Sequence, residues 1–315
     1  MTEELLSKYG QKLDIIFPQN DCLKAAPTFQ TVKDYYTTSG NYYTRFHSPE
    51  GALHLPISFS SKTPHKKKLQ YQAECVSTSI KERACKSILE LGCGMGFNTK
   101  LLAQKHPESH FTGIDITPRN IAEAQKNTSA LNNTRFVCQN YQHLEEQDGS
   151  YDLIFAVESL CYATSLPSLI RKLHAKLNPG GRIVIFDAYI NPEAQLGTES
   201  EQKAYKYLSW GFAMERFQHL EEIFAPEVLE RYNIAFQQDL SLHILPNFLT
   251  FQAAAHKVLR FPRVLKQLVK LKLLSPIFIR QVAAGIFGPY FVQEKYLSYR
   301  HIVLDKKEKT TPHLD

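Results

Sequence analysis

A glycine-rich loop is the segment whose residue types and spacing most clearly indicate chemistry. Gly92, Gly94 and Gly96 occupy every second position directly after the strand-like run 88–91. Glycine allows the backbone to turn with positive φ and to approach a bound group where a Cβ atom would collide. The residues that follow begin a helix, whose free N–H groups and positive dipole end attract an anionic group. The segment therefore predicts a binding site for a small ligand with an anionic part.

The positions of the glycines distinguish between two kinds of nucleotide loop. A dinucleotide loop has the pattern Gly-x-Gly-x-x-Gly, with a third glycine three residues after the second. Counted from Gly92 that third place holds Phe97, and counted from Gly94 it holds Thr99. The NAD pattern is therefore absent, and a different cofactor is expected.

The run from Glu90 to Gly96 has the pattern acid-x-Gly-x-Gly-x-Gly, and over residues 85–190 the sequence resembles the class I S-adenosylmethionine-dependent methyltransferases. The resemblance implies that the loop surrounds the amino-acid part of S-adenosylmethionine, with Glu90 beneath it and near the ammonium. It also implies that Asp115 accepts hydrogen bonds from both ribose hydroxyls and that Ile116 packs against the adenine. An N-cap for the helix that follows is the alternative role of Asp115.

Asn140 departs from the pattern of that family. The family usually has an aspartate here, after the third strand, which accepts a hydrogen bond from the adenine amino group. An amide oxygen can accept the same bond with less charge assistance, and an ordinary polar loop is the alternative. The residues expected to bind the cofactor are Glu90, Gly92, Cys93, Gly94, Gly96, Asp115, Ile116, Asn140, Tyr35 and Tyr43.

Two further segments resemble a narrower group, the sterol and terpenoid C-methyltransferases. The run 155–163 is similar to their Ala-Ile-Glu-Ala-Thr-Cys-His-Ala segment, and the run 35–43 is similar to their Tyr-Tyr-x5-[Phe/Tyr]-Tyr motif. Tyr162 stands where that group has a histidine, which is a departure. His54 corresponds to a histidine that follows the aromatic motif in that group, with two extra residues between.

These residue types suit methyl transfer to an alkene carbon, which leaves a carbocation on the acceptor. Aromatic faces stabilise a cation, and a buried carboxylate can pair with it or take a proton from it. Glu158 follows a central strand and faces the crevice where open α/β sheets bind ligands, and Asp187 ends the next strand there. The expected catalytic residues are Glu158, Tyr162 and His54. The alternative roles are cofactor or structural hydrogen bonding for Glu158, packing in the core or lid for Tyr162, and a structural hydrogen bond for His54. No metal site is expected.

A strand–helix alternation positions these residues. Short apolar runs predict strands at 88–91, 111–114, 136–138, 153–157 and 183–186, and helices are predicted between them at 97–106, 118–131 and 165–177. Apolar runs without in–out alternation are typical of a parallel sheet that is covered on both faces. Outside this region we predict helices at 68–83, 200–208 and 216–231, strands at 234–239 and 297–304, and helix breaks at Pro262, Pro276 and Gly288-Pro289.

The fold class is therefore α/β. The family resemblance implies a Rossmann-like doubly wound sheet of seven strands, with an N-terminal helical and aromatic lid and a C-terminal helical cap. The expected domains are the lid at 1–84, the cofactor-binding core at 85–239, a basic apolar helical cap at 240–293, and a final strand with a tail at 294–315.

The positive charge of this 315-residue chain is concentrated in one segment. The formal net charge is +6, yet residues 240–293 hold seven Lys and Arg and no Asp or Glu, so the remainder carries −1. A nucleic-acid surface needs basic residues spread along a groove or face, so nucleic acid is not an expected partner. Three roles remain open for the cap: peripheral membrane contact through 257–280 above an apolar acceptor, binding of a substrate phosphate, or a solvated helix face over the core.

The remaining composition favours a cytoplasmic location. Six cysteines are scattered without a Cys-x-x-Cys pair, which indicates free thiols in a reducing compartment. The first residues have no apolar signal core, and the longest apolar stretch, 282–292, is too short to span a membrane. Membrane association through the cap is a further expectation.

The leading functional hypothesis is an S-adenosylmethionine-dependent methyltransferase that acts on a small, largely apolar or lipid-like acceptor, with sterol- or terpenoid-like C-methylation favoured. O- or N-methylation of a lipid or metabolite is the alternative within the enzyme class. A protein that keeps the fold but binds a membrane or a partner without catalysis is the alternative from another class, because a fold does not fix a function.

Overall fold

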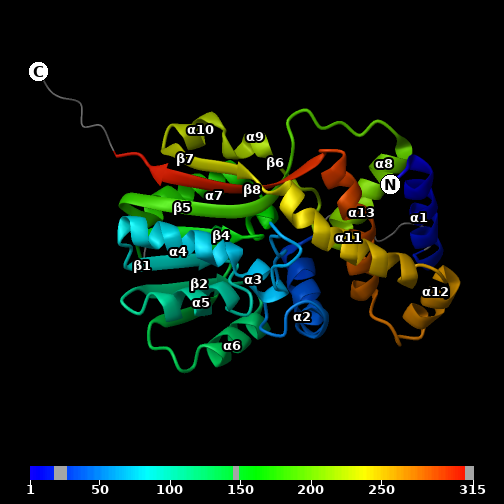
Figure 1. Ribbon diagram of the computed structural model, residues 1–315, viewed down its shortest axis with the longest axis horizontal. Helices are drawn as coiled ribbons and strands as arrows, with labels where there is room; N and C mark the ends of the chain where they lie inside the picture. Colours follow the sequence, from blue (N-terminus) through cyan, green and yellow to red (C-terminus); the bar gives the residue numbers. More distant parts are fainter. Residues whose placement is uncertain (18–26, 145–148, 309–315) are drawn as a thin grey trace, which may run out of the picture.

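The computed structural model describes residues 1–17, 27–144 and 149–308, without the side chains of 41–43 and 46. A central sheet organises the molecule, with strand order β3-β2-β1-β4-β5-β8-β7 and a short β6 that pairs with β5 (Figure 1). The strands are β1 Ser87–Leu91, β2 His110–Asp115, β3 Thr134–Cys138, β4 Tyr151–Val157, β5 Leu177–Ile190, β6 Gln218–His219, β7 Tyr232–Asp239 and β8 Leu297–Lys306. The five predicted core strands run parallel, whereas β8 is antiparallel to both β5 and β7. The predicted α/β fold with a seven-stranded sheet is confirmed, with β6 as a two-residue addition.

Both faces of the central strands β1, β4 and β5 are covered by helices, which explains why these strands are largely apolar. On β4, Leu153 and Phe155 belong to a cluster with α4 and α5, whereas Ile154 and Ala156 belong to a cluster with α7, α9 and α10. Successive side chains of a strand point to opposite faces, so a strand buried on both sides needs apolar residues throughout. These helices are α4 Tyr71–Arg83, α5 Phe97–Lys105, α7 Leu166–Lys176, α9 Leu220–Ile223 and α10 Pro226–Leu229; α6 Pro118–Asn127 packs on β2 and β3.

A group of helices from both ends of the chain forms the cap. It consists of α1 Glu3–Ile16, α8 Glu199–Gly211, α11 Ser241–Val258, α12 Pro262–Lys270 and α13 Pro276–Gln293. Here α13 packs on α8 and α11, and α1 packs on α8 and α12. Figure 1 shows this cap at one end of the sheet, with α2 Phe29–Phe46 and α3 His65–Leu69 between the two parts.

Two predicted features of the chain are wrong. The predicted helix at 216–231 is divided into β6, α9 and α10, because Gln218 and His219 pair with the backbone of β5 and Pro226 begins a new helix. The predicted break at Gly288-Pro289 is absent, and α13 continues to Gln293. The Gly288 side of α13 lies against Phe248 of α11, so tertiary packing outweighs the weak helix propensity of this pair.

The predicted final strand lies inside the sheet. Residues 297–306 form β8, which lies between β5 and β7. The sheet therefore includes this strand, and helices α11, α12 and α13 of the cap are inserted between β7 and β8.

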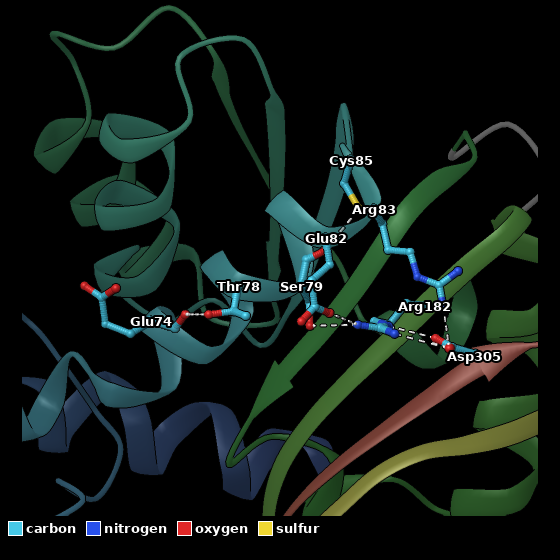
Figure 2. A network of polar contacts seen from close by, with 8 residues as sticks. All are labelled: Glu74, Thr78, Ser79, Glu82, Arg83, Cys85, Arg182 and Asp305. Atoms are coloured by element: carbon cyan, nitrogen blue, oxygen red, sulfur yellow. Dashed lines mark hydrogen bonds and ion pairs between the residues drawn. The ribbon is translucent and has the colours of Figure 1, made fainter.

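An ion network ties β8 to the rest of the sheet at the end where β5 begins (Figure 2). Arg182 pairs in register with Asp305, and its Nε lies 2.7 Å from Oδ1 of that carboxylate. The same guanidinium donates to Glu82 and Ser79 of α4, and Arg83 reaches Asp305 as well. Since Arg182 is 8% exposed, its charge is removed from water but is fully paired.

Candidate active site

A cavity of about 810 Å³ lies at the carboxyl ends of β1, β2 and β4, lined by the predicted glycine loop. All three glycines have positive φ, at +69° for Gly92, +52° for Gly94 and +78° for Gly96. A Cβ atom at Gly92 would collide with Ser159, and one at Gly94 would lie 2.9 Å from a methyl carbon of Leu53. The loop therefore requires glycine both for its conformation and for its close contacts.

Glu90 lies beneath the loop and lines the cavity, as predicted. Its carboxylate accepts hydrogen bonds from the Thr99 hydroxyl and backbone N–H and from the Asn98 amide, all at the start of α5. Burial raises the pKa of Glu90 to about 7. Asn98 also lines the cavity, and among the described residues its buried Oδ1 has no hydrogen-bond partner. A carboxylate beside an unpartnered amide oxygen suits a group with several donors, such as an ammonium.

Asp115 connects the glycine loop to β2. Its Oδ2 accepts from the N–H of Gly94 at 2.9 Å, and its Oδ1 accepts from the N–H of Thr117 and the amide of Asn120. The bond to Thr117 is the interaction expected of an N-cap, yet Asp115 also lines the cavity. A carboxylate has about four acceptor positions, so these contacts leave capacity for a hydroxyl. Burial raises the pKa of Asp115.

Three further predicted cofactor residues line the same cavity: Cys93, Ile116 and Asn140. Asn140 uses its Oδ1 to accept from the N–H of Gln142, which caps a short turn at Tyr141–His143. Its amide oxygen retains a second lone pair, so capping does not prevent it from accepting from a ligand. Burial raises the pKa of the Cys93 thiol well above its usual value, which makes this residue a packing group.

The two predicted tyrosines of α2 are placed differently. Tyr35 is buried and does not line the cavity; its ring faces the guanidinium of Arg280 at 5.5 Å. Its neighbour Tyr36 lines the cavity instead, because one residue along a helix turns the side chain by about 100°. The side chain of Tyr43 lies outside the described residues.

A second chamber of about 650 Å³ adjoins the first. The two share the lining residues Tyr36, Leu53, Glu158 and Tyr162. The chamber is lined mainly by apolar side chains of the cap and of β8: Leu208, Phe212, Met214, Phe217, Ile244, Phe248, Val292 and Leu297. A polar cavity around the glycine loop thus meets an apolar chamber at these shared residues.

Glu158 is the ionisable residue at that boundary. It has φ +52°, a conformation that is costly for a residue with a side chain and that clusters at functional sites. Its Oε1 accepts from the N–H of Leu55 and from the hydroxyl of Tyr299, each at 2.8 Å. Burial, together with the nearby Asp187, raises the pKa of Glu158 to about 8.

Tyr162 forms a pair with Tyr36 at the same boundary. The Tyr162 hydroxyl donates to the carbonyl of Phe212, so in the 2.9 Å contact between the two hydroxyls Tyr36 is the donor. The rings meet edge to face with centroids 6.0 Å apart. Asp187 faces the chamber as predicted, accepts from the N–H of Cys161, and has its pKa raised to about 6 by burial.

His54 lines the first cavity, but its contacts are those of an anchoring residue. Its Nε2 lies 2.9 Å from the carbonyl of Leu69, and its ring meets Phe97 edge to face. Burial lowers the pKa of His54 to about 4, so the ring is neutral near pH 7 and donates to that carbonyl. The structure therefore brings His54 to the cavity that also contains Glu158 and Tyr162, with a hydrogen bond that fixes the segment before α3.

Tyr299, like Asn98, is a site residue that our sequence reasoning missed. Its hydroxyl donates to Glu158 and lies 3.4 Å from the amide nitrogen of Gln72, which also donates to the carbonyl of Leu55. The strand at 297–304 was predicted, and the alternation along it offered a signal for an inward-facing tyrosine. Its proximity to Glu158 depends on the insertion of β8 beside β5, which the local sequence does not specify.

Residues 88–181 match the family of methyltransferase domains. A malonyl-[acyl-carrier protein] O-methyltransferase of Bacillus cereus is 34% identical over 108 residues, which are 34% of this chain and 39% of that protein. A trans-aconitate 2-methyltransferase of Escherichia coli is 38% identical over 100 residues, which are 32% of this chain and 38% of that protein. The chain thus spans about two fifths of the length of these curated relatives.

The fold extends further than the sequence similarity. The cyclopropane synthase MmaA2 of Mycobacterium tuberculosis superposes with a TM-score of 0.71 over 90% of this chain and 100% of that chain, at 11% identity. The geranyl diphosphate C-methyltransferase of Streptomyces coelicolor superposes with a TM-score of 0.59 over 90% of this chain and 100% of that chain, at 15% identity. At such identities the likeness concerns the fold alone. The chain therefore combines a match to a methyltransferase domain at residues 88–181 with a Rossmann-like fold that it shares with these proteins.

Proposed function

We propose that this protein transfers a methyl group from S-adenosylmethionine to a small, largely apolar acceptor in the second chamber. The observation that carries the proposal is the junction of the two cavities at Glu158, Tyr36 and Tyr162. One cavity has the donors and acceptors of a nucleotide-type site, and the other is apolar. Binding the two reactants side by side is the main requirement of a displacement reaction.

The first cavity fits the cofactor through residues described above. The carboxylate of Glu90 and the unpartnered oxygen of Asn98 would hold the ammonium of the cofactor, and Asp115 would hold its ribose. When bound, S-adenosylmethionine supplies an electrophilic methyl group on a sulfonium. The glycine loop and α2 surround this cavity, since Phe29, Val32 and Tyr36 of α2 line it.

The lining of the chamber favours a neutral acceptor. Its ionisable side chains include the carboxyls of Glu158 and Asp187, and no Lys, Arg or His is among its described lining residues. A substrate carboxylate or diphosphate would meet like charge there without a cation to pair with it, which is unfavourable in a buried site. The seven cations of the cap therefore have a role other than holding a substrate phosphate in this chamber.

C-methylation is the subtype that the boundary residues favour. Attack by an alkene on the sulfonium methyl would form the new carbon–carbon bond with the π pair. The carbon–sulfur bond would break with its electron pair leaving on sulfur, and a carbocation would remain on the acceptor. The rings of Tyr36 and Tyr162 can stabilise that cation. The carboxylate of Glu158 can then take a proton from the adjacent carbon, and the electrons of that C–H bond restore the double bond. The raised pKa of Glu158 makes its carboxylate a stronger base than an exposed one.

O-methylation of a neutral hydroxyl is the second candidate. The similarity of the core to an O-methyltransferase of Bacillus cereus favours it. In that reaction Glu158 would take the hydroxyl proton, so the same residue serves both subtypes. Product analysis distinguishes C-methylation from O-methylation. C-methylation keeps every hydroxyl group of the acceptor and adds a methyl group on carbon, whereas O-methylation converts a hydroxyl group into a methyl ether.

Calorimetric titration with S-adenosylhomocysteine tests the cofactor site. The wild type is expected to bind, and Gly94→Ala is expected to weaken binding more than tenfold, because its Cβ would meet Leu53 at φ +52°. Gly197→Ala is the matched control, since its Cβ would lie at an ordinary 3.5 Å from a flexible Glu201 side chain. Absence of heat with the wild-type protein would overturn the proposal.

Transfer itself is measured by incubating lipid extracts with isotopically labelled S-adenosylmethionine, followed by mass spectrometry. Label in a neutral apolar product supports the proposal, and fragmentation locates the methyl group on carbon or oxygen. Label confined to carboxylic acids would contradict the inference from the chamber. Binding of cofactor without any transfer would favour the non-catalytic alternative.

A further inference from the structure

The tip of the cap carries an exposed surface that combines large apolar side chains with cations. Phe261 is 61% exposed, Val264 56%, Leu271 64% and Leu273 72%. Exposed cations interleave with them along the chain. We call this surface the α12 patch; it consists of Arg260, Phe261, Arg263, Val264, Lys270, Leu271, Lys272 and Leu273.

The patch arises because the apolar face of α12 is wider than the surface that covers it. Helix α12 packs on α1 and buries Leu265, while Leu268 and Val269 are half-buried. Val264 and Leu271 lie on the flank of the same apolar face and remain in water. An ordinary surface helix has polar residues at such positions, since its apolar stripe matches the core that it covers. Exposure of Val264 and Leu271 to water costs free energy unless another apolar surface covers them.

The end of α12 enlarges this flank. Lys272 has φ +58°, so the chain turns sharply and the N–H groups of Leu273 and Leu274 both return to the carbonyl of Leu268. This turn leaves Leu271 and Leu273 exposed on either side of Lys272. Single exposed apolar side chains are common on protein surfaces, but here four of them, Phe261, Val264, Leu271 and Leu273, are exposed within 13 residues.

The electrostatic surroundings of the patch are positive. Residues 240–293 contain no Asp or Glu. On α1, the helix that packs against α12, the acidic residues are Glu3 and Glu4 in the first turn and Asp14, which is paired with Lys203 and Tyr207 of α8. The exposed cations of the patch are therefore not neutralised by their own segment, and the surface is complementary to an anionic phase.

We propose that the α12 patch docks on an anionic phospholipid bilayer, with its apolar side chains inserted between the headgroups. Basic residues beside exposed Phe and Leu on a short amphipathic helix are the combination that binds a membrane interface. Phosphates of a nucleic acid would pair with the cations but would leave the apolar flank in water. Among the described residues no helix is long and apolar enough to cross a membrane. The patch therefore contacts one leaflet, and this inference does not depend on the transfer reaction.

Co-sedimentation with vesicles tests the proposal on the full chain. The wild type is expected to bind vesicles of phosphatidylglycerol and phosphatidylcholine in equal parts, and to bind much less to pure phosphatidylcholine. Two double variants divide the contributions. Lys270→Gln with Lys272→Gln should reduce binding roughly thirtyfold, from about a fivefold loss per cation. Leu271→Ser with Leu273→Ser should reduce it at least about tenfold through lost apolar burial.

Matched controls come from exposed residues elsewhere on the surface. Lys62→Gln with Lys67→Gln removes two exposed cations, and Ile234→Ser removes an exposed apolar side chain of β7. Both should leave vesicle binding within about twofold of the wild type. Binding of S-adenosylhomocysteine reports that each variant is folded, because the patch is remote from the residues that line that cavity.

The outcomes separate the bilayer from other anionic partners. Loss of binding in both patch variants, with unchanged controls, supports the proposal. Loss in the lysine variant alone indicates a purely electrostatic contact, as with nucleic acid or an acidic protein, and overturns it. Equal effects of patch and control variants, or no binding to anionic vesicles by the wild type, overturn it as well.

Discussion

Strand β5 carries a buried charged residue near each end, and the two have opposite surroundings. At one end the Arg182 guanidinium is held by Asp305 and Glu82, and these hydrogen bonds raise its pKa (Figure 2). At the other end Asp187 and Glu158 face a chamber without a described cation, and burial raises the pKa of both carboxyls.

The residues around Arg182 at one end of β5 contribute to stability, whereas the carboxyls at the other end are suited to chemistry. A buried ion that is fully paired holds β5, β8 and α4 in register, and its partners leave it no reactivity. Buried carboxyls without a counterion favour the neutral form, which costs stability when they ionise but provides a base whose pKa lies near neutral pH. Substitutions at the two ends should therefore have opposite effects on folding and on methyl transfer.

The largest effect is expected from Glu158→Gln. The amide keeps the shape of the side chain but cannot take a proton, so the rate of C-methyl transfer should fall by about 10² to 10⁴. Folding should be unharmed or improved at pH 8, because a buried carboxylate is removed. Turnover with labelled cofactor and urea unfolding of the same sample measure both quantities. Undiminished transfer would show that approximation alone suffices and that Glu158 does not take a proton in the reaction.

Arg182→Met should have the reverse effect. It leaves Asp305 with only Arg83 as a partner, and the free energy of unfolding should fall by about 3 kcal/mol. Affinity for S-adenosylhomocysteine should change less than twofold at a temperature where the variant is folded. Arg231→Met is the control, since its pair with Glu230 is exposed and should contribute less than about 1 kcal/mol. A large loss of affinity for S-adenosylhomocysteine in Arg182→Met would show that the ion pairs of Arg182 also affect the ligand cavity, and it would contradict the difference drawn between the two ends of β5.

The free energy of unfolding, measured at a series of pH values, tests whether the carboxyls of Glu158 and Asp187 are buried without a counterion. The folded protein holds the Glu158 proton up to a pKa of about 8, whereas the unfolded chain loses it near 4.5, so the folded form binds more protons between these values. Stability should therefore decrease as pH rises from about 4.5 to about 8, and Asp187 adds to the decrease from about 4 to about 6. Above pH 6 the decrease should be smaller in Glu158→Gln, and an identical slope would contradict the burial of an uncompensated carboxyl.

The smallest effect is expected from Tyr299→Phe. This change removes a hydrogen bond that favours the ionised form of Glu158, so the pKa of that carboxyl should rise further. The pH profile of transfer should move to higher pH by less than about one unit, with about 1 kcal/mol lost in transition-state stabilisation. Tyr296→Phe, just before the same strand, serves as the control. A profile that does not move would assign Tyr299 to packing only.

Local rules account for the parts of the site that the sequence predicts. The conformation of the Gly92–Gly96 loop depends on residues in direct succession, and Glu158 and Asp115 follow predicted strands whose carboxyl ends form the crevice. The placement of Tyr36 rather than Tyr35 depends on the rotation of α2 about its axis, which the aromatic motif does not fix. The role of Tyr299 depends on the pairing of β8 with β5, over 100 residues apart in sequence.

The cap shows a further limit of sequence patterns. Val264, Leu265 and Leu271 lie on one apolar face by helical periodicity, and periodicity does not reveal how much of such a face is covered. The structure divides it into a buried part and an exposed part. The predicted break at Gly288-Pro289 fails for a related reason, since the packing of α13 on α11 is a property of the assembled cap.

The central position of β8 also has a consequence for biosynthesis. Residues 297–306 leave the ribosome after all the other strands, yet they lie between β5 and β7 in the finished sheet. Until they emerge, the nascent chain has its complete glycine loop but no strand to join β7 to β5 and no Tyr299 beside Glu158. A polypeptide interrupted before residue 297 would thus retain the glycine loop but would lack Leu297 and Tyr299 in the lining of the second chamber, so this chamber is completed only when the last strand is inserted.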